Sequence, residues 1–218
     1  MDDIYTGNGV SELINLSMQA LLNDGDEILI PAPDYPLWTA TATLAGGKVV
    51  HYICDEESDW NPDIADIRSK ITDKTKAIVI INPNNPTGAV MTREDLEAIA
   101  EVIIRHDIYV LSDEIYSELT YAGDHVSIAS LPGMKERTIV VNGFSKAYAM
   151  TGWRLGYAVG PEPVIKVMTK IHQSCIMSAP TTSQYAAIAA LHSCDDSIEM
   201  MRDEYNRRRR YVVKALND

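Results

Sequence analysis

Short apolar runs of strand length alternate with segments of helical periodicity along almost the whole chain. The run at 76–81, KAIVII, is apolar throughout, as expected of a strand that is buried on both faces of a sheet. Such alternation favours helices on both sides of a mostly parallel sheet, so we expect an α/β fold of three layers, an α/β/α sandwich. The predicted strands are 27–31, 48–53, 76–81, 108–112, 138–142 and 155–160, and the predicted helices are 9–23, 36–45, 63–70, 93–105 and several after 161, including a long polar one near 196–216.

Composition and charge exclude several classes of protein. The chain has 218 residues, of which 46% are hydrophobic and 23% charged, and this excludes a disordered chain. No apolar run reaches the length of about 18 residues that a membrane span needs. A net charge of −12 disfavours a nucleic-acid-binding surface. The run Arg207–Arg210 is therefore predicted to be a solvated helix face.

The cysteines and the first residues of the chain indicate in which cellular compartment the protein is expected. Cys54, Cys175 and Cys194 lack the spacing of metal ligands, and their number is odd. The opening MDDIYTGNGV has no apolar core of the kind that a signal peptide needs. We expect reduced structural thiols, no metal site and a cytoplasmic protein.

Polar clusters follow the ends of three predicted strands. Asn82–Gly88 follows 76–81, Asp113 follows 108–112, and Lys146 follows 138–142. Ligands of parallel sheets bind beyond the carboxyl ends of the strands, so these clusters are candidates for one site. A fourth cluster, Gly7–Ser11, opens the first predicted helix, where free backbone amides can bind an anion.

Each cluster alone has an ordinary interpretation, as a tight turn or a surface lysine, but together they point to one cofactor. A carboxylate such as Asp113 at a buried strand end is costly unless it is paired, and a cationic ring nitrogen would pair it. A desolvated lysine such as Lys146 can form a Schiff base. Arg154 can hold a phosphate by paired hydrogen bonds. This set of groups is what pyridoxal phosphate needs.

Three motifs carry a resemblance to a known family. The stretch GFSKAYAMTGWRLG at 143–156, the loop NPNNPTG at 82–88 and the pair Asp113 and Tyr116 are similar in order and spacing to the class I/II aminotransferases. These are pyridoxal-phosphate enzymes of fold type I. The stretches APDYPLW, GGKVVHY and DEESDW are most similar to the bacterial alanine (glutamate–pyruvate) aminotransferases.

The resemblance implies a role for each candidate site residue. Lys146 would bind the cofactor covalently and move the substrate proton, and Asp113 would pair with the pyridinium nitrogen. Asn85 and Tyr116 would contact the ring oxygen, and Tyr35 would stack on the ring. The amides of Gly9, Val10 and Ser11 would bind the phosphate together with Arg154. Many relatives also have a serine or threonine three residues before the lysine; this chain has Gly143 there, and Ser145 is the expected substitute.

The resemblance also implies a domain division. Residues 1–195 correspond to an N-terminally incomplete large domain that binds the cofactor, and 196–218 to the start of an interdomain helix. Relatives are about twice as long and form homodimers. We therefore expect a homodimer in the full-length protein, and apolar faces in this chain that the other parts would cover.

Four functional alternatives remain open. The leading one is transfer of an amino group between an amino acid, alanine or glutamate, and a 2-oxo acid. The cofactor residues do not distinguish this reaction from that of a carbon–sulfur lyase or a decarboxylase-like enzyme on the same scaffold. A third is the aminotransferase-like half of a transcription regulator, which the lack of a basic helix-turn-helix disfavours. A fourth is a cofactor-binding fragment without full turnover.

Overall fold

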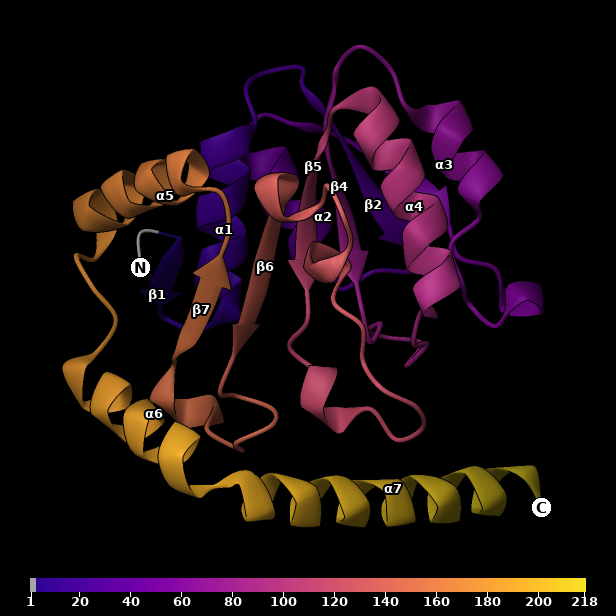
Figure 1. Ribbon diagram of the computed structural model, residues 1–218, viewed down its shortest axis with the longest axis vertical. Helices are drawn as coiled ribbons and strands as arrows, with labels where there is room; N and C mark the ends of the chain where they lie inside the picture. The colour runs from indigo at the N-terminus through magenta and orange to yellow at the C-terminus, as the bar shows by residue number, and fades with distance from the viewer. Residues whose placement is uncertain (1–2) are drawn as a thin grey trace.

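The computed structural model describes residues 3–218, and its centre is a seven-stranded sheet (Figure 1). The strand order is β1-β7-β6-β5-β4-β2-β3. Strand β7 runs antiparallel to both its neighbours, β6 and β1, and the other pairs are parallel. The strands are β1 (Ile4–Gly7), β2 (Glu27–Ala32), β3 (Lys48–Ile53), β4 (Thr75–Ile81), β5 (Tyr109–Asp113), β6 (Thr138–Gly143) and β7 (Gly156–Val159).

Helices cover both faces of the sheet, which confirms the expected three-layer sandwich. Helices α1 (Val10–Leu21), α2 (Leu37–Leu44) and α5 (Glu162–Cys175) lie on one face, and α3 (Ile64–Lys70) and α4 (Arg93–His106) lie on the other. Strand β4 shows how the sequence builds two cores. Val79 and Ile81 pack toward α1, whereas Ile78 and Ile80 pack toward α4, and all four are buried. Successive side chains of a strand point to opposite faces, so a wholly apolar strand belongs between two layers.

The predicted elements are present with small changes at their ends. Helix α4 begins at Arg93 as predicted, directly after Thr92, and the side chains of Thr92 and Asp95 form a reciprocal capping box. Strand β5 runs one residue further than predicted, so Asp113 is its last residue rather than the residue after it. Strand β1 was not predicted. It has four residues and pairs through its backbone with β7. So short a segment shows no apolar pattern from which a strand could be predicted.

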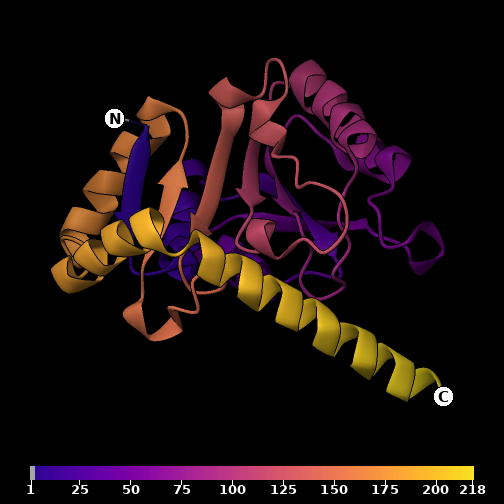
Figure 2. The same ribbon diagram turned by 60° about the horizontal axis from the view of Figure 1, so that its bottom comes forward.

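Two further helices lie beyond the sheet. Helix α6 (Thr181–Ser193) lies near the start of β7, and α7 (Asp195–Asn217) runs below the carboxyl ends of β4, β5 and β6 and projects past the sheet (Figures 1 and 2). Both expose apolar side chains, as expected of faces that other parts would cover; these include Tyr185, Ile188 and Leu191 on α6, and Val212, Val213 and Leu216 on α7.

The arginine run of α7 and the apolar content of the helices were also predicted from the sequence. Arg207–Arg210 is exposed, and Arg207 and Arg208 each lie 2.7 Å from a Glu204 carboxylate oxygen, so the predicted solvated face is confirmed. Between residues 3 and 218, no helix is both long and apolar enough to cross a bilayer.

Two glycines, Gly143 of β6 and Gly156 of β7, pair with each other across these strands. A Cβ atom on Gly143 would lie 2.9 Å from the Gly156 Cα and 2.9 Å from the Leu155 carbonyl oxygen. Both atoms belong to the backbone, so neither can rotate away. The glycine that departs from the family pattern is therefore required by strand packing in this chain.

This packing predicts the effect of adding one methyl group. Gly143→Ala should lower the free energy of unfolding by about 1–3 kcal/mol, because the backbones of β6 and β7 must separate. The matched control is Gly152→Ala, where a Cβ meets nothing within 4 Å. It should change stability by less than about 0.5 kcal/mol in the same urea denaturation. Equal stability of the two variants would show that the contact between the strands is not rigid.

Candidate active site

The carboxyl ends of three parallel strands are in register, and this brings the predicted clusters together. Ile81 of β4 pairs with Asp113 of β5, which pairs with Val141 of β6. The segments that follow these strands border a cavity of about 240 Å³. Nine of the ten predicted site residues line it: Val10, Ser11, Tyr35, Asn85, Asp113, Tyr116, Ser145, Lys146 and Arg154.

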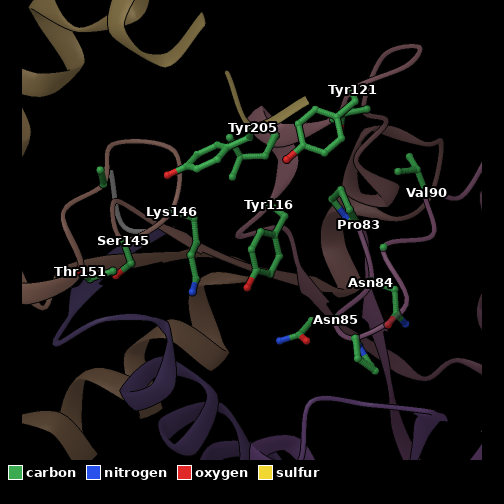
Figure 3. A pocket seen from close by; sticks show the side chains of 15 residues that line it. Pro83, Asn84, Asn85, Val90, Tyr116, Tyr121, Ser145, Lys146, Thr151 and Tyr205 are labelled. Atoms are coloured by element: carbon green, nitrogen blue, oxygen red, sulfur yellow. The ribbon is translucent and has the colours of Figure 1, made fainter. Parts of the chain in front are cut away.

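Lys146 and Tyr116 lie side by side at the centre of this arrangement. The Lys146 Nζ is 5.5 Å from the centre of the Tyr116 ring. Figure 3 shows the amine and the phenol hydroxyl pointing the same way, with the Asn85 amide facing both. Three polar groups from three strand ends thus face one space. A larger cavity of about 670 Å³ adjoins it and is bordered by the loop at 83–90 and by Tyr205 of α7.

Hydrogen bonds fix the loop that carries Asn85. Asn82 donates its backbone N–H to the Asp113 carbonyl over 3.0 Å, and its side-chain oxygen accepts from the Met91 N–H at 3.0 Å. The Asn84 carbonyl accepts from the Gly88 N–H at 2.9 Å. The loop is therefore closed on itself and tied to β5, which holds Asn85 over the cavity.

Asp113 is a buried carboxylate with weak hydrogen bonds. Its side chain accepts from the Ile115 N–H at 3.2 Å and from the Trp38 indole N–H at 3.4 Å. Burial raises the pKa of the Asp113 carboxyl to about 6; these hydrogen bonds act in the opposite direction, the neighbouring Glu114 charge raises it further, and the Lys146 charge lowers it. Within residues 3–218 no cation lies at ion-pair distance from it. The carboxylate would therefore be stabilised by a cationic group placed in the cavity.

The start of α1 borders the cavity with backbone amides. No side chain in the described part of the chain caps this helix, so its first-turn amides at Val10 and Ser11 remain available. The Gly9 amide differs from the expectation, because it donates to the Gly7 carbonyl at 2.8 Å. Gly9 contributes instead by lacking a side chain. Its φ is +82°, and a Cβ there would lie 2.7 Å from the Arg154 Nη2.

The Arg154 guanidinium is held beside this helix terminus. It donates to the Thr151 carbonyl at 3.1 Å and to the Asn8 carbonyl at 3.4 Å. A guanidinium and two free amides that face one space make a site for a phosphate or a carboxylate.

Four residues of the site were not predicted from sequence. Ile14, Ile115 and Thr151 complete the lining of the cavity, and Trp38 contacts Asp113 from behind. Ile14 lies one helical turn after Val10, so helical spacing could have indicated it. The Trp38 contact joins residues that are 75 positions apart, and nothing local in the sequence indicates it.

The cysteines lie outside this cavity. All three cysteines are free; Cys54 is buried in the core, and Cys175 is exposed at the end of α5. Within residues 3–218 no cluster of three or more histidine, cysteine or acidic residues is arranged to hold a metal ion.

Comparisons with known proteins agree on one family. The family model described as aminotransferase class I and II matches residues 1–218. A glutamate–pyruvate aminotransferase of Escherichia coli is 57% identical over 166 residues, which are 74% of this chain and 40% of that protein.

Two solved structures extend this likeness to the fold. The aromatic aminotransferase of Pyrococcus horikoshii has a TM-score of 0.96 and 44% identity, covering 99% of this chain and 58% of that one. Aspartate aminotransferase of Thermus thermophilus with maleate has a TM-score of 0.94 and 39% identity, covering 99% and 57%. The chain spans about half the length of these relatives.

The buried carboxylate predicts a pH-dependent stability difference. The folded pKa of Asp113 lies above its ordinary value of 3.8, so the folded chain binds more protons than the unfolded chain between pH 4 and pH 6. This group therefore makes the fold less stable as the pH rises through that window. Asp113→Asn should stabilise the cofactor-free chain by about 1–3 kcal/mol at pH 8, and by less than half of that at pH 4.5.

The measurement is urea denaturation of the native chain and the variant at the two pH values. Asp73→Asn is the matched control, because Asp73 is exposed, and its effect should be the same at both. An Asp113→Asn effect that does not change with pH would contradict the assignment of a buried ionised carboxylate.

Proposed function

The chain belongs to the class I and II aminotransferase family, and on that premise we propose that it is the cofactor-binding part of an aminotransferase that uses pyridoxal phosphate. The observation that carries this proposal is the convergence of three groups on one cavity. They are the Asp113 carboxylate, the Lys146 amine, and the start of α1 with Arg154. The cofactor has three matching groups: a ring nitrogen that takes a proton, an aldehyde and a phosphate.

The residues present fit this cofactor. Asp113 is buried without a cation at ion-pair distance among residues 3–218, and a protonated ring nitrogen would supply one. The phosphate would receive hydrogen bonds from the Val10 and Ser11 amides and from Arg154. Ser145, which also lines the cavity, supports the expectation that it replaces the hydroxyl that position 143 lacks.

The position of each site residue then supports a specific role. When bound, pyridoxal phosphate supplies a reactive aldehyde and a ring that withdraws electrons. Lys146 would hold the aldehyde carbon through Nζ, and afterwards its amine would move the proton of the substrate α-carbon. Asp113 would bind the ring nitrogen and keep it protonated. The Tyr116 hydroxyl and the Asn85 amide would orient the ring oxygen, and Tyr35 would pack on the ring face.

The substrate proposal rests on sequence similarity rather than on the cavity. The Escherichia coli protein that is 57% identical is named for glutamate and pyruvate, and we therefore propose alanine or glutamate as the amino donor and a 2-oxo acid as the acceptor. Neighbours named for aspartate and for aromatic substrates share the same fold, so this part of the fold does not select the substrate.

The proposal includes a homodimer in the cytoplasm. Helix α6 presents Tyr185, Ile188 and Leu191 with more than half of each side chain exposed. A row of large apolar side chains on one helix is costly in water and supports a face that a second copy covers.

Cofactor binding is tested by one substitution at the proposed attachment point. Purified chain mixed with pyridoxal phosphate should develop a new absorbance band, shifted from that of the free cofactor, which Lys146→Ala lacks because the new band requires the Lys146 amine. Borohydride should then fix the mass of the cofactor on the peptide that contains Lys146. Lys170→Ala, at an exposed lysine of α5, is the matched control and should keep the band. A band of equal strength in Lys146→Ala would contradict the role given to this lysine.

The reaction is tested on a protein of the family's full length that carries this sequence. Nitrogen-15 from labelled alanine should appear in glutamate when 2-oxoglutarate is present, with no release of ammonia. A carbon–sulfur lyase would instead release ammonia from a cysteine-like substrate. Asp113→Ala should lower the transfer rate at least a hundredfold, because an unprotonated ring is a poor electron sink. Near-normal transfer in this variant would overturn the assignment of Asp113.

A further inference from the structure

A chain of buried polar contacts lies behind the proposed phosphate site. His172 of α5 is completely buried, and its two ring nitrogens contact residues from two other elements. Nδ1 lies 2.6 Å from the Tyr5 hydroxyl of β1, and Nε2 lies 3.1 Å from the Glu12 carboxylate of α1. A histidine whose two nitrogens are both engaged is fixed in orientation and in tautomer.

One arrangement of protons satisfies this chain. Burial raises the pKa of Tyr5, and the Glu12 charge raises it further, so the hydroxyl keeps its proton and can donate to the His172 Nδ1. With Nδ1 accepting from Tyr5, Nε2 is the nitrogen that carries a hydrogen and donates it to Glu12. The histidine thus acts as a rigid connector between the Tyr5 hydroxyl and the Glu12 carboxylate.

Glu12 passes this constraint to the loop before α1. Its Oε2 accepts from the Asn8 backbone N–H at 2.7 Å and from the Asn8 side-chain amide at 2.9 Å. The Asn8 carbonyl in turn accepts from the Arg154 guanidinium at 3.4 Å. Asn8 lies between Gly7, which pairs with Gly156 of β7, and Gly9, which precedes the free amides. Its position therefore sets where those amides and the guanidinium lie.

The charge of Glu12 argues that its role is orientation. A carboxylate in the first turn beside a phosphate site repels the phosphate, so it does not improve binding through its charge. What it offers is an acceptor that fixes the loop backbone through two hydrogen bonds from one residue. Keeping such an acceptor in place requires a partner, and the buried His172 is that partner.

We propose that His172 is a positioning residue for the cofactor phosphate, acting through Glu12 and Asn8 on the anion-binding start of α1 and on Arg154. The inference rests on the proposed function, because it requires the phosphate of pyridoxal phosphate at this place. It assigns to α5, which contributes no residue to the lining of the cavity, a part in building it.

The test compares two ligands that differ only in the phosphate. Dissociation constants for pyridoxal phosphate and for pyridoxal are measured on the native chain, His172→Phe and His172→Gln. His172→Phe keeps a ring in place but removes both hydrogen bonds, and it should weaken pyridoxal phosphate about tenfold while changing pyridoxal less than twofold. His172→Gln keeps an N–H donor toward Glu12 and should recover most of the loss. The matched control is His51→Phe, at an exposed histidine of the edge strand β3, which should change neither constant.

A second variant covers the case in which His172→Phe does not fold. Tyr5→Phe keeps the ring and removes only the hydroxyl that orients the imidazole, and it should weaken pyridoxal phosphate about two- to threefold without affecting pyridoxal. If every folded variant weakens both ligands equally, or neither, then His172 is merely structural and the inference is wrong. If the native chain binds neither ligand, the proposed cofactor is wrong. If the native chain binds pyridoxal phosphate more tightly than pyridoxal and the variants keep that preference, the cofactor stands and only the role of His172 is wrong.

Discussion

The burial of one carboxylate at the end of the central strand β5 is the constraint on which the site depends. Asp113 is held there by its strand register, by the Ile115 amide and by the Trp38 indole, none of which neutralises a full charge. The next residue, Glu114, shows the contrast, because it accepts from Ser112 and Ser127 and lies 3.1 Å from His125. One carboxylate is thus satisfied within the fold, and its neighbour is left to be satisfied by whatever enters the cavity. Burial accordingly raises the pKa of the Asp113 carboxyl to about 6.

The layers of the fold could be predicted from local sequence patterns. The elements that were not predicted depend on contacts between distant parts of the chain, which local patterns do not include. A continuous apolar run made β4 predictable, and a capping threonine followed three residues later by an acidic residue made the start of α4 predictable. Strand β1 escapes both rules, because it has only four residues and pairs through its backbone with β7, so it carries no apolar pattern of its own. The extra residue of β5 escapes for a similar reason, since pairing of Asp113 with Ile81 and Val141 decides where that strand ends.

The residues of the site also fall into those that the sequence predicts and those that it does not. Lys146 and Asn85 were found because they follow strand ends, and Arg154 was found because it lies in the same motif as Lys146; nine of the ten predicted residues border one cavity. The groups that support them were not found. Tyr5 and His172 are 167 positions apart, and Trp38 and Asp113 are 75 apart, so only the folded chain brings them together. A ligand-facing residue is constrained by chemistry that a motif records, whereas a supporting residue is constrained by its neighbours, which differ from one fold to another.

The facing glycines of β6 and β7 limit how this sequence can change over evolutionary time. Because Gly143 touches the backbone at Gly156, a hydroxyl side chain three residues before the lysine cannot be gained by a single substitution without moving two strands. On this side of the cavity a hydroxyl must therefore come from the segment that follows β6, where Ser145 and Thr151 already border the cavity. Gly156 is constrained from a second side, since a Cβ there would lie 2.9 Å from the Val10 backbone nitrogen, so a substitution at this glycine would disturb the start of α1 as well.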